Sequence, residues 1–342
     1  MKIMFIKARK ALITVAILAA LSSTSVFASV IANDALSPSL SDTANMLKNN
    51  KELINKFYDA FKTGDKSIIL SYVTDDFIMH VPGKGLNAGE YWGKAGFTKF
   101  LTNIENYSGG DFSLSVPSLA INEDTIFTRE HITMNRKENP NEKWFLRFIM
   151  EYRIKDGLIS EAWTIPQDPI AYDAFWTPNS QYIETRPTGF SPKTVDISDN
   201  DPFTDAIDSL QIVRKFYHYF WKGDLLSMSK LTGKDFEFYT PGRSNLAGRY
   251  KGWHGYETFR DKLIATVAGD KYKLEWGGYA ASKNDVFVKE YIRMNTSWDK
   301  EVKTSFVILH YTMKEGKIAK IEDTPVNALE YDALFTNPVT GK

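Results

Sequence analysis

Apolar residues at helical spacing open two stretches of the chain, one starting near residue 54 and the other near residue 213. In each stretch they stand at positions i, i+3, i+4 and i+7, which places them on one face of a helix. The first set is Ile54, Phe57, Tyr58 and Phe61, and the second is Val213, Phe216, Tyr217 and Phe220. Glycine and aspartate follow each set at 64–65 and 223–224. The glycine can end the helix and the aspartate can cap a short second one.

Strand patterns dominate the remainder of each stretch. A short strand is predicted at 77–81 and again at 236–240, each broken by Pro-Gly, and a glycine-bearing loop then leads to a third helix. In the first stretch, further strands are predicted at 112–116, 125–134, 144–154 and 158–165, with a polar turn at 137–141. Helices followed by a run of antiparallel strands form an α+β pattern, in which the helices pack on one face of the sheet.

The two stretches repeat one another. Lys56-Phe57-Tyr58 returns as Lys215-Phe216-Tyr217 at a spacing of 159, and the spacing is 160 between Glu130 and Glu290. A spacing held over a whole unit, with single slips at turns, indicates a duplicated domain rather than a solenoid. We therefore predict two domains, at 45–176 and 205–336. The proline-containing, aperiodic stretch 177–204 is the predicted linker.

The segment 1–28 has the composition of a secretory signal. Four basic residues precede the apolar run 11–21, and Val26-Phe27-Ala28 provides a small-x-small exit site. This run is too short for a bilayer, which needs about 20 apolar residues. The expectation is an exported protein, periplasmic or secreted, after cleavage near Ala28.

Composition removes several kinds of site. The chain has no cysteine, so it has neither disulfides nor a thiolate metal site. No His-x-His or Glu-x-x-His spacing occurs either, so no metal and no cofactor are expected. Without the four basic residues of the signal, 38 basic and 42 acidic residues give a net charge of −4. That balance argues against nucleic acid and anionic membranes as partners.

The order of these motifs resembles the SnoaL-like proteins of the nuclear transport factor 2-like and ketosteroid-isomerase-like superfamily. The motifs that carry the resemblance are Phe61-x-x-Gly64-Asp65, Asp76-Phe77, Pro82-Gly83 and Gly157-x-Ile-x-Glu-x-Trp163. The resemblance implies two tandem cone-shaped domains, each with about three helices packed in a strongly curved, mostly antiparallel sheet. Relatives usually pair sheet to sheet, so the two copies are expected to form an intramolecular pseudo-dimer.

The polar groups that the resemblance implies for ketosteroid isomerisation and cyclisation are replaced in both units. The tyrosine, the aspartate before the loop proline and the second oxyanion donor correspond here to Phe57 and Phe216, Val81 and Thr240, and Met150 and Leu309. None of these side chains takes a proton at neutral pH. Those two reactions, by those residues, are therefore not expected.

Glu130 and Glu290 are the best candidates for inward-facing acids. Strand alternation places each glutamate on an otherwise apolar face, with Ile132 and Met134 in the first unit. Desolvation would raise the pKa of such a carboxyl group and suit it as a base or a ligand anchor. The alternative is a structural carboxylate paired with arginine, or one that faces solvent.

Other candidate ligand-binding residues surround these acids. Tyr58 and Tyr217 on the first helices, and Trp163 on the last strand, are predicted as core or pocket wall. His80 lies beside the glycine-bearing loop and could reach the pocket rim, while Arg243 lies within that loop in the second unit.

The expected function is binding of a small, apolar or amphipathic molecule in one or both cones. A second hypothesis is a lyase or isomerase that uses Glu130 or Glu290 as general base. A third is a structural pseudo-dimer whose pockets are filled by its own side chains. A deep pocket with a desolvated glutamate favours the enzyme, a wholly apolar one the binder, and a collapsed one the structural protein.

Export is directly testable. N-terminal sequencing of the protein from its own host should give a chain that starts at Ser29, in a soluble extracytoplasmic fraction, because the apolar run is too short to anchor. An intact Met1 in the membrane fraction would contradict this prediction.

Overall fold

The computed structural model describes residues 40–108, 112–186, 204–267 and 272–337. The predicted signal peptide and residues 187–203 of the predicted linker lie outside this part of the chain. No helix among the described residues is long and apolar enough to cross a bilayer.

The structure has two groups of elements in the same order. The first group contains α3 (Leu40–Thr63), α4 (Lys66–Leu70), β1 (Val73–Val81), β2 (Gly89–Trp92), α5 (Gly93–Ser108), β3 (Phe112–Ile121), β4 (Thr125–Arg136), β5 (Asn139–Lys155), β6 (Leu158–Pro166) and α6 (Pro169–Phe175). The second contains α7 (Thr204–Lys222), α8 (Leu225–Lys230), β7 (Thr232–Thr240), β8 (Gly248–Lys251), α9 (Gly252–Thr266), β9 (Lys273–Ala281), β10 (Asp285–Met294), β11 (Lys303–Lys314), β12 (Lys317–Pro325) and α10 (Ala328–Phe335).

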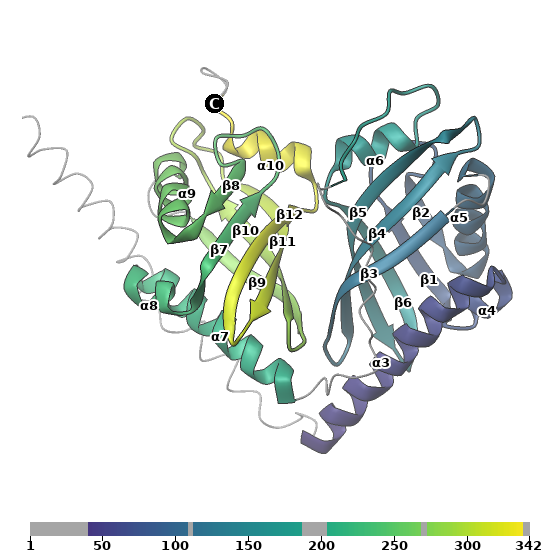
Figure 1. Ribbon diagram of the computed structural model, residues 1–342, viewed down its shortest axis with the longest axis horizontal. Helices are drawn as coiled ribbons and strands as arrows, with labels where there is room; N and C mark the ends of the chain where they lie inside the picture. The colour runs from purple at the N-terminus through teal and green to yellow at the C-terminus, as the bar shows by residue number, and fades with distance from the viewer. Residues whose placement is uncertain (1–39, 109–111, 187–203, 268–271, 338–342) are drawn as a thin grey trace, which may run out of the picture.

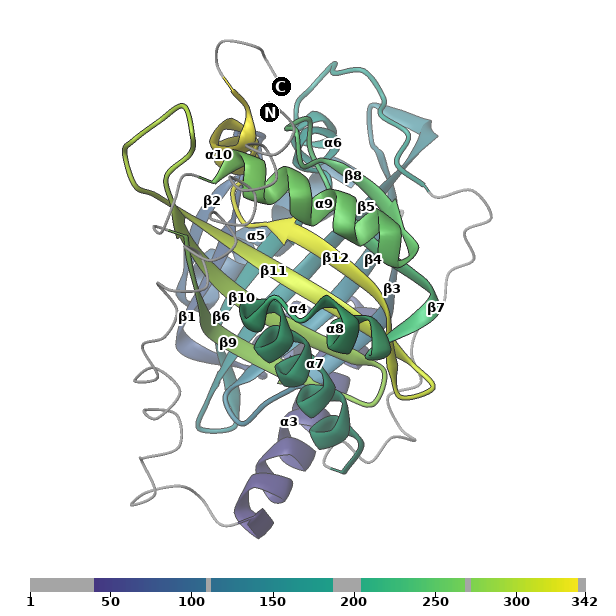
Figure 2. The same ribbon diagram turned by 90° about the vertical axis from the view of Figure 1, so that its left-hand side faces the viewer.

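The strands lie in the order β2-β1-β6-β5-β4-β3-β9-β10-β11-β12-β7-β8. Neighbours are antiparallel except for β1 with β6 and β7 with β12, which are parallel. The sheets of the two halves are joined by the pairing of β3 with β9, in which Ile121 lies opposite Ala281. The α+β fold with a mostly antiparallel, strongly curved sheet is therefore confirmed in each half. The two sheets face each other in the middle, with α8 and α9 on the outer side of one half, α4 and α5 on the outer side of the other, and α6 and α10 at the top (Figure 1). Helices α7, α8 and α9 lie over one sheet in Figure 2.

Local sequence explains the element boundaries. Asp65 and Asp224 accept hydrogen bonds from the backbone N–H groups of Ser67 and Ser227 and so cap α4 and α8, as predicted. The predicted turn at 137–141 is shorter than expected, because β5 already begins at Asn139. The residue before a proline favours extended backbone, and Asn139 precedes Pro140.

Strands β4 and β10 are largely buried on both faces, with Arg293 of β10 exposed. One face of each packs on the helices of its own half, and the other faces the opposite sheet. The side chains between the sheets form an apolar cluster of Ala120, Phe127, Ile149, Ile165, Ala280, Phe287 and Ile308. The rings of Phe127 and Phe287 stack at its centre, with centroids 5.6 Å apart and planes 11° from parallel.

Two ion pairs flank this cluster. Arg129 of β4 contacts Glu322 of β12, and Lys289 Nζ of β10 lies 2.8 Å from Glu151 Oε2 of β5. The two acids of these pairs are almost fully buried. Because a buried charge is costly without a partner, these pairs fix how the two sheets are aligned.

Removing the central ring should destabilise the whole chain. Phe127→Ala deletes a fully buried ring from the contact between the sheets and should lower the free energy of unfolding by about 3–5 kcal/mol. Phe306→Ala is the control, because Phe306 is 39% exposed and should cost much less. Urea denaturation of the full chain measures both, and equal losses would contradict the assigned role of the cluster.

Candidate functional site

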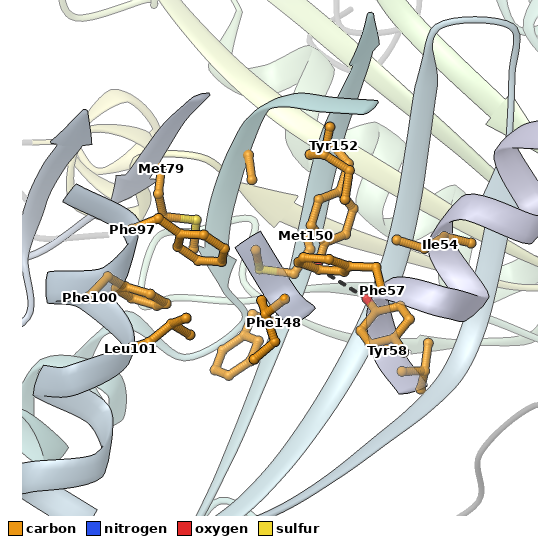
Figure 3. Close-up of a cluster of buried hydrophobic side chains, with 14 of the residues drawn as sticks. Ile54, Phe57, Tyr58, Met79, Phe97, Phe100, Leu101, Phe148, Met150 and Tyr152 are labelled. Carbon is orange, nitrogen blue, oxygen red and sulfur yellow. Dashed lines mark hydrogen bonds between the residues drawn. The ribbon is translucent and has the colours of Figure 1, made fainter. Parts of the chain in front are cut away.

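Each half contains one cavity between its helices and the concave face of its sheet. The cavity in the first half has a volume of about 90 Å³ and that in the second about 70 Å³. Both are lined mainly by aromatic and aliphatic side chains. Figure 3 shows Phe57, Met79, Phe97, Phe148 and Met150 gathered at the first. A few buried polar groups therefore decide the chemistry of each cavity.

In the first cavity, three hydroxyl groups surround one glutamate oxygen. Glu130 Oε1 accepts hydrogen bonds from Tyr58 Oη at 2.5 Å, Tyr152 Oη at 2.9 Å and Thr128 Oγ1 at 3.2 Å. Figure 3 shows Tyr58 and Tyr152 approaching one another from α3 and β5. This oxygen has all the donors that it can accommodate in the described structure.

Burial and hydrogen bonding have opposite effects on the pKa of Glu130. Burial raises the pKa of its carboxyl group, whereas the hydrogen bonds from Tyr58, Tyr152 and Thr128 lower it. The pKa of Tyr58 lies well above 10, first because the phenol is buried and second because it faces Glu130. The tyrosine thus remains a donor, and the first cavity has an internally satisfied polar centre.

The second cavity lacks the corresponding arrangement. Glu290 is only 2% exposed, and Val288 stands where the first half has Thr128. Among the described residues, neither Glu290 Oε1 nor the hydroxyl of Tyr217 has a hydrogen-bond partner. Leaving a buried polar group unpaired costs about 1–3 kcal/mol. These two groups are therefore available to a bound molecule.

A second carboxyl group, that of Asp323 on β12, lines the same cavity. Its Oδ2 atom accepts from Tyr331 Oη at 2.6 Å and from Thr240 Oγ1 at 3.0 Å. Its Oδ1 atom has no partner among the described residues. Burial raises the pKa of Asp323 to about 6, although the two hydroxyl donors act in the opposite direction.

The two acids influence each other. The pKa of Glu290 lies well above 4.5, first because the carboxyl group is buried and second because Asp323 is nearby. Two neighbouring carboxyl groups in an apolar site resist being ionised together, so one holds a proton while the other is charged. Such a pair can exchange a proton with a bound molecule or hold a cation. No group of three or more metal-ligating side chains occurs in the described part of the chain.

One family model matches part of the first half. Residues 54–162 match the family model described as a SnoaL-like domain. The first half contains a SnoaL-like domain. A search of curated proteins gave no match.

Several solved structures are similar to parts of the chain. Bal32a from a soil-derived mobile gene cassette is 20% identical, with a TM-score of 0.36, over 38% of this chain and 98% of its own. An NTF2-like protein from Burkholderia xenovorans LB400 is 16% identical, with a TM-score of 0.34, over 38% and 98%. TerC, co-crystallized with polyporic acid, is 24% identical, with a TM-score of 0.34, over 36% and 95%.

Four of the predicted site residues lie in cavity walls. Tyr58 and Glu130 line the cavity of the SnoaL-like domain, and Tyr217 and Glu290 line the second cavity. Within the described chain, neither glutamate is paired with arginine or turned to solvent, so the structural alternative for these residues does not apply.

The predictions for His80 and Trp163 are corrected, because neither side chain lines either of these cavities. Their rings stack on each other with centroids 4.9 Å apart, and His80 Nε2 lies 2.7 Å from Glu161 Oε1. Lys289 Nζ lies 5.2 Å from the ring of Trp163. Both residues therefore lie on the sheet face toward the second half. Successive residues of a strand point to opposite faces, and these two alternate with cavity-lining Met79 and Ala162.

Arg243 is also corrected. It is exposed at the tip of the loop between β7 and β8 and lines neither cavity. Its backbone N–H donates to the carboxylate of Asp332 at 2.9 Å, which ties the loop to α10. The arginine therefore belongs to a loop anchor rather than to the cavity wall.

The sequence interpretation missed Asp323. Its counterpart in the SnoaL-like domain, at the repeat spacing of 159, is Thr164, which also lines a cavity. Strand alternation after Ile321, another wall residue, could have identified it. The donors Thr240 and Tyr331 come from β7 and α10, and their approach depends on tertiary structure.

Because the pKa of Asp323 is raised, replacing this residue with a neutral one should increase the stability of the folded protein. Because the folded state binds this proton more strongly than the unfolded chain, wild-type stability should fall as pH rises from about 4 to about 6. Asp323→Asn should remove that fall and exceed wild type by about 1–3 kcal/mol at pH 7, and match it near pH 4. Urea denaturation at both pH values measures this, with exposed Asp261→Asn as control. A less stable variant at pH 7 would contradict it.

Proposed function

We propose that the protein is an exported tandem SnoaL-like protein that binds a small, largely apolar molecule in one or both cones. The observation that carries the proposal is that each half keeps a cavity lined by apolar side chains around a buried acid. Cores are normally packed without voids that could hold more than a water molecule. Volumes of about 70 and 90 Å³ therefore favour a binding site over a structural pseudo-dimer with filled pockets.

The tandem arrangement belongs to this proposal, with domains at 45–176 and 205–336 and a linker at 177–204. Residues between the sheets support it, because they recur at the repeat spacing. Phe127 stacks on Phe287 at a spacing of 160, and Ile149 and Ile308 are separated by 159. In an isologous interface, residues near the two-fold axis meet their own equivalents. An intramolecular pseudo-dimer accounts for these contacts.

Export rests on the sequence of the segment 1–28, and the proposed partners follow from composition. A small apolar or amphipathic ligand suits the cavity walls, whereas a chain with slightly more acidic than basic residues after the signal does not favour nucleic acid or anionic membranes.

A lyase or isomerase is the second candidate, and the acid pair of the second half favours it. A general base works best when its pKa lies near the working pH, and that of Asp323 is about 6. Glu290 would then hold the proton that the pair shares. In the first half, Glu130 Oε1 is engaged by three hydroxyl groups, and the described residues that line the cavity include no second acid.

Native mass spectrometry of the protein purified from its own host tests binding most simply. A co-purifying small molecule is expected, and cavity-filling variants should reveal which cone holds it. Ala162→Ile gives the first cone the residue that the second has at Ile321, and Val307→Phe gives the second cone the equivalent of Phe148. A variant that loses bound molecule identifies a cone that holds it, and a variant that retains all of it serves as the matched control.

Circular dichroism should show both variants folded, because each introduces a side chain that the other half already accommodates. Retention of the molecule by the double variant would contradict binding in the cones.

A further inference from the structure

Three unpaired buried oxygens face the second cavity. They are Oδ1 of Asp323, Oε1 of Glu290 and the hydroxyl of Tyr217, which come from β12, β10 and α7. Their residues are 4%, 2% and 7% exposed, so bulk water does not satisfy them. All three atoms can accept a hydrogen bond. A molecule that fills this cavity therefore meets three acceptors that have no partner among the described residues.

The rest of the wall suits a cation. Aromatic rings of Tyr217, Phe220, Tyr256, Tyr272 and Tyr311 border the cavity, and no lysine, arginine or histidine is among the described residues that line it. The face of an aromatic ring attracts a cation electrostatically. The acids thus have no positive partner of their own within the cavity.

We propose that the second cone binds a small primary ammonium compound, whose three N–H groups donate to Asp323, Glu290 and Tyr217. A primary ammonium has three N–H donors, one for each of these oxygens. This inference rests on the proposed function, because it assumes that the cone holds a ligand, and it adds the chemical class of that ligand.

Size limits the compound further. A cavity of about 150 Å³ holds benzene, which has six heavy atoms. The second cavity, at about 70 Å³, is about half as large and therefore suits an ammonium compound smaller than benzene. Isopropylamine, with four heavy atoms, is the probe, and isopropanol is its uncharged equivalent of the same shape.

The first cone is an internal control. It has the equivalent glutamate and tyrosine, but Glu130 Oε1 already accepts from Tyr58, Tyr152 and Thr128. An ammonium group would have to displace these donors to bind this oxygen. The same amine should therefore bind in the second cone of a molecule and not in the first.

Proton binding gives a second readout. The titratable groups around the site are Glu290 and Asp323 together with the tyrosines Tyr217, Tyr256, Tyr272, Tyr311 and Tyr331. The pKa values of Tyr272, Tyr311 and Tyr331 all lie above 10 because the phenols are buried, so only the acids change charge near neutral pH. Because Asp323 ionises with a pKa of about 6, affinity for the amine should rise about tenfold between pH 5 and pH 7.

The experiment is an NMR titration of the full mature chain with methyl-labelled isoleucine, leucine and valine. Ile292, Val307 and Leu309 report on the second cone, and Leu114, Ile132 and Leu146 report on the first. Isopropylamine at pH 7 should shift the reporters of the second cone at concentrations at least tenfold lower than isopropanol, and should leave the first cone unchanged.

Variants assign the effect to the acids. Asp323→Asn and, independently, Glu290→Gln should each remove the preference for the amine while isopropanol still binds. Exposed Asp261→Asn is the matched control and should keep the preference. The unperturbed methyl spectrum of the first cone shows that each variant is folded, and two separate variants guard against the failure of one.

The outcomes separate this inference from the proposed function. Equal binding of amine and alcohol in the second cone, or equal amine binding in both cones, would overturn the inference and leave the proposed function standing. Ligand-free protein from the host, together with no shift in either cone, would overturn both. An amine preference that survives both acid variants would overturn the assignment to these carboxyl groups.

Discussion

The alternation of side chains along β4 and β10 is the constraint on which the rest of the structure depends. Apart from exposed Arg293 near the end of β10, both strands are at least partly buried on both faces, so most positions along them belong either to the contact between the sheets or to the side of a cavity. Phe127 and Arg129 face the opposite sheet, while Thr128 and Glu130 face the first cavity. A slip of one residue would exchange the two sets. The stacking of Phe127 on Phe287 and the flanking ion pairs therefore also fix which acidic side chains of these strands point into the cavities.

Within this shared frame, a few substitutions give the two cavities different chemistry. Thr128 becomes Val288, which removes a donor from the glutamate of the second half. Thr164 becomes Asp323, which adds a second acid, and Thr240 supplies that acid with a donor where the first half has only valine. The first cavity thus has one acid with three partners, and the second has two acids with unpaired oxygens. Buried groups left unpaired lower stability, and natural proteins retain such costs mainly at functional sites.

Much of the fold could be predicted from the sequence, because the patterns that indicate its helices and strands are local. Apolar spacing predicted the helix that contains Ile54, although α3 starts as early as Leu40, and alternation along 125–134 placed Glu130 on an inward face. Long-range contacts could not be predicted from the sequence. His80 was expected at a pocket rim, but pairing of β1 with β6 stacks it on Trp163 at the other face. Asp323 was missed because its role depends on donors from elements that are distant in the sequence.

The central claim is that the second cavity holds a coupled pair of acids that resist ionisation. NMR titration of carboxyl-labelled aspartate and glutamate in the full mature chain tests it most directly, with resonances assigned by Asp323→Asn and Glu290→Gln. The account predicts a pKa of about 6 for Asp323 and a value for Glu290 well above 4.5, and Asp323→Asn should lower the pKa of Glu290. Both groups titrating near 4, with no effect of one on the other, would contradict it.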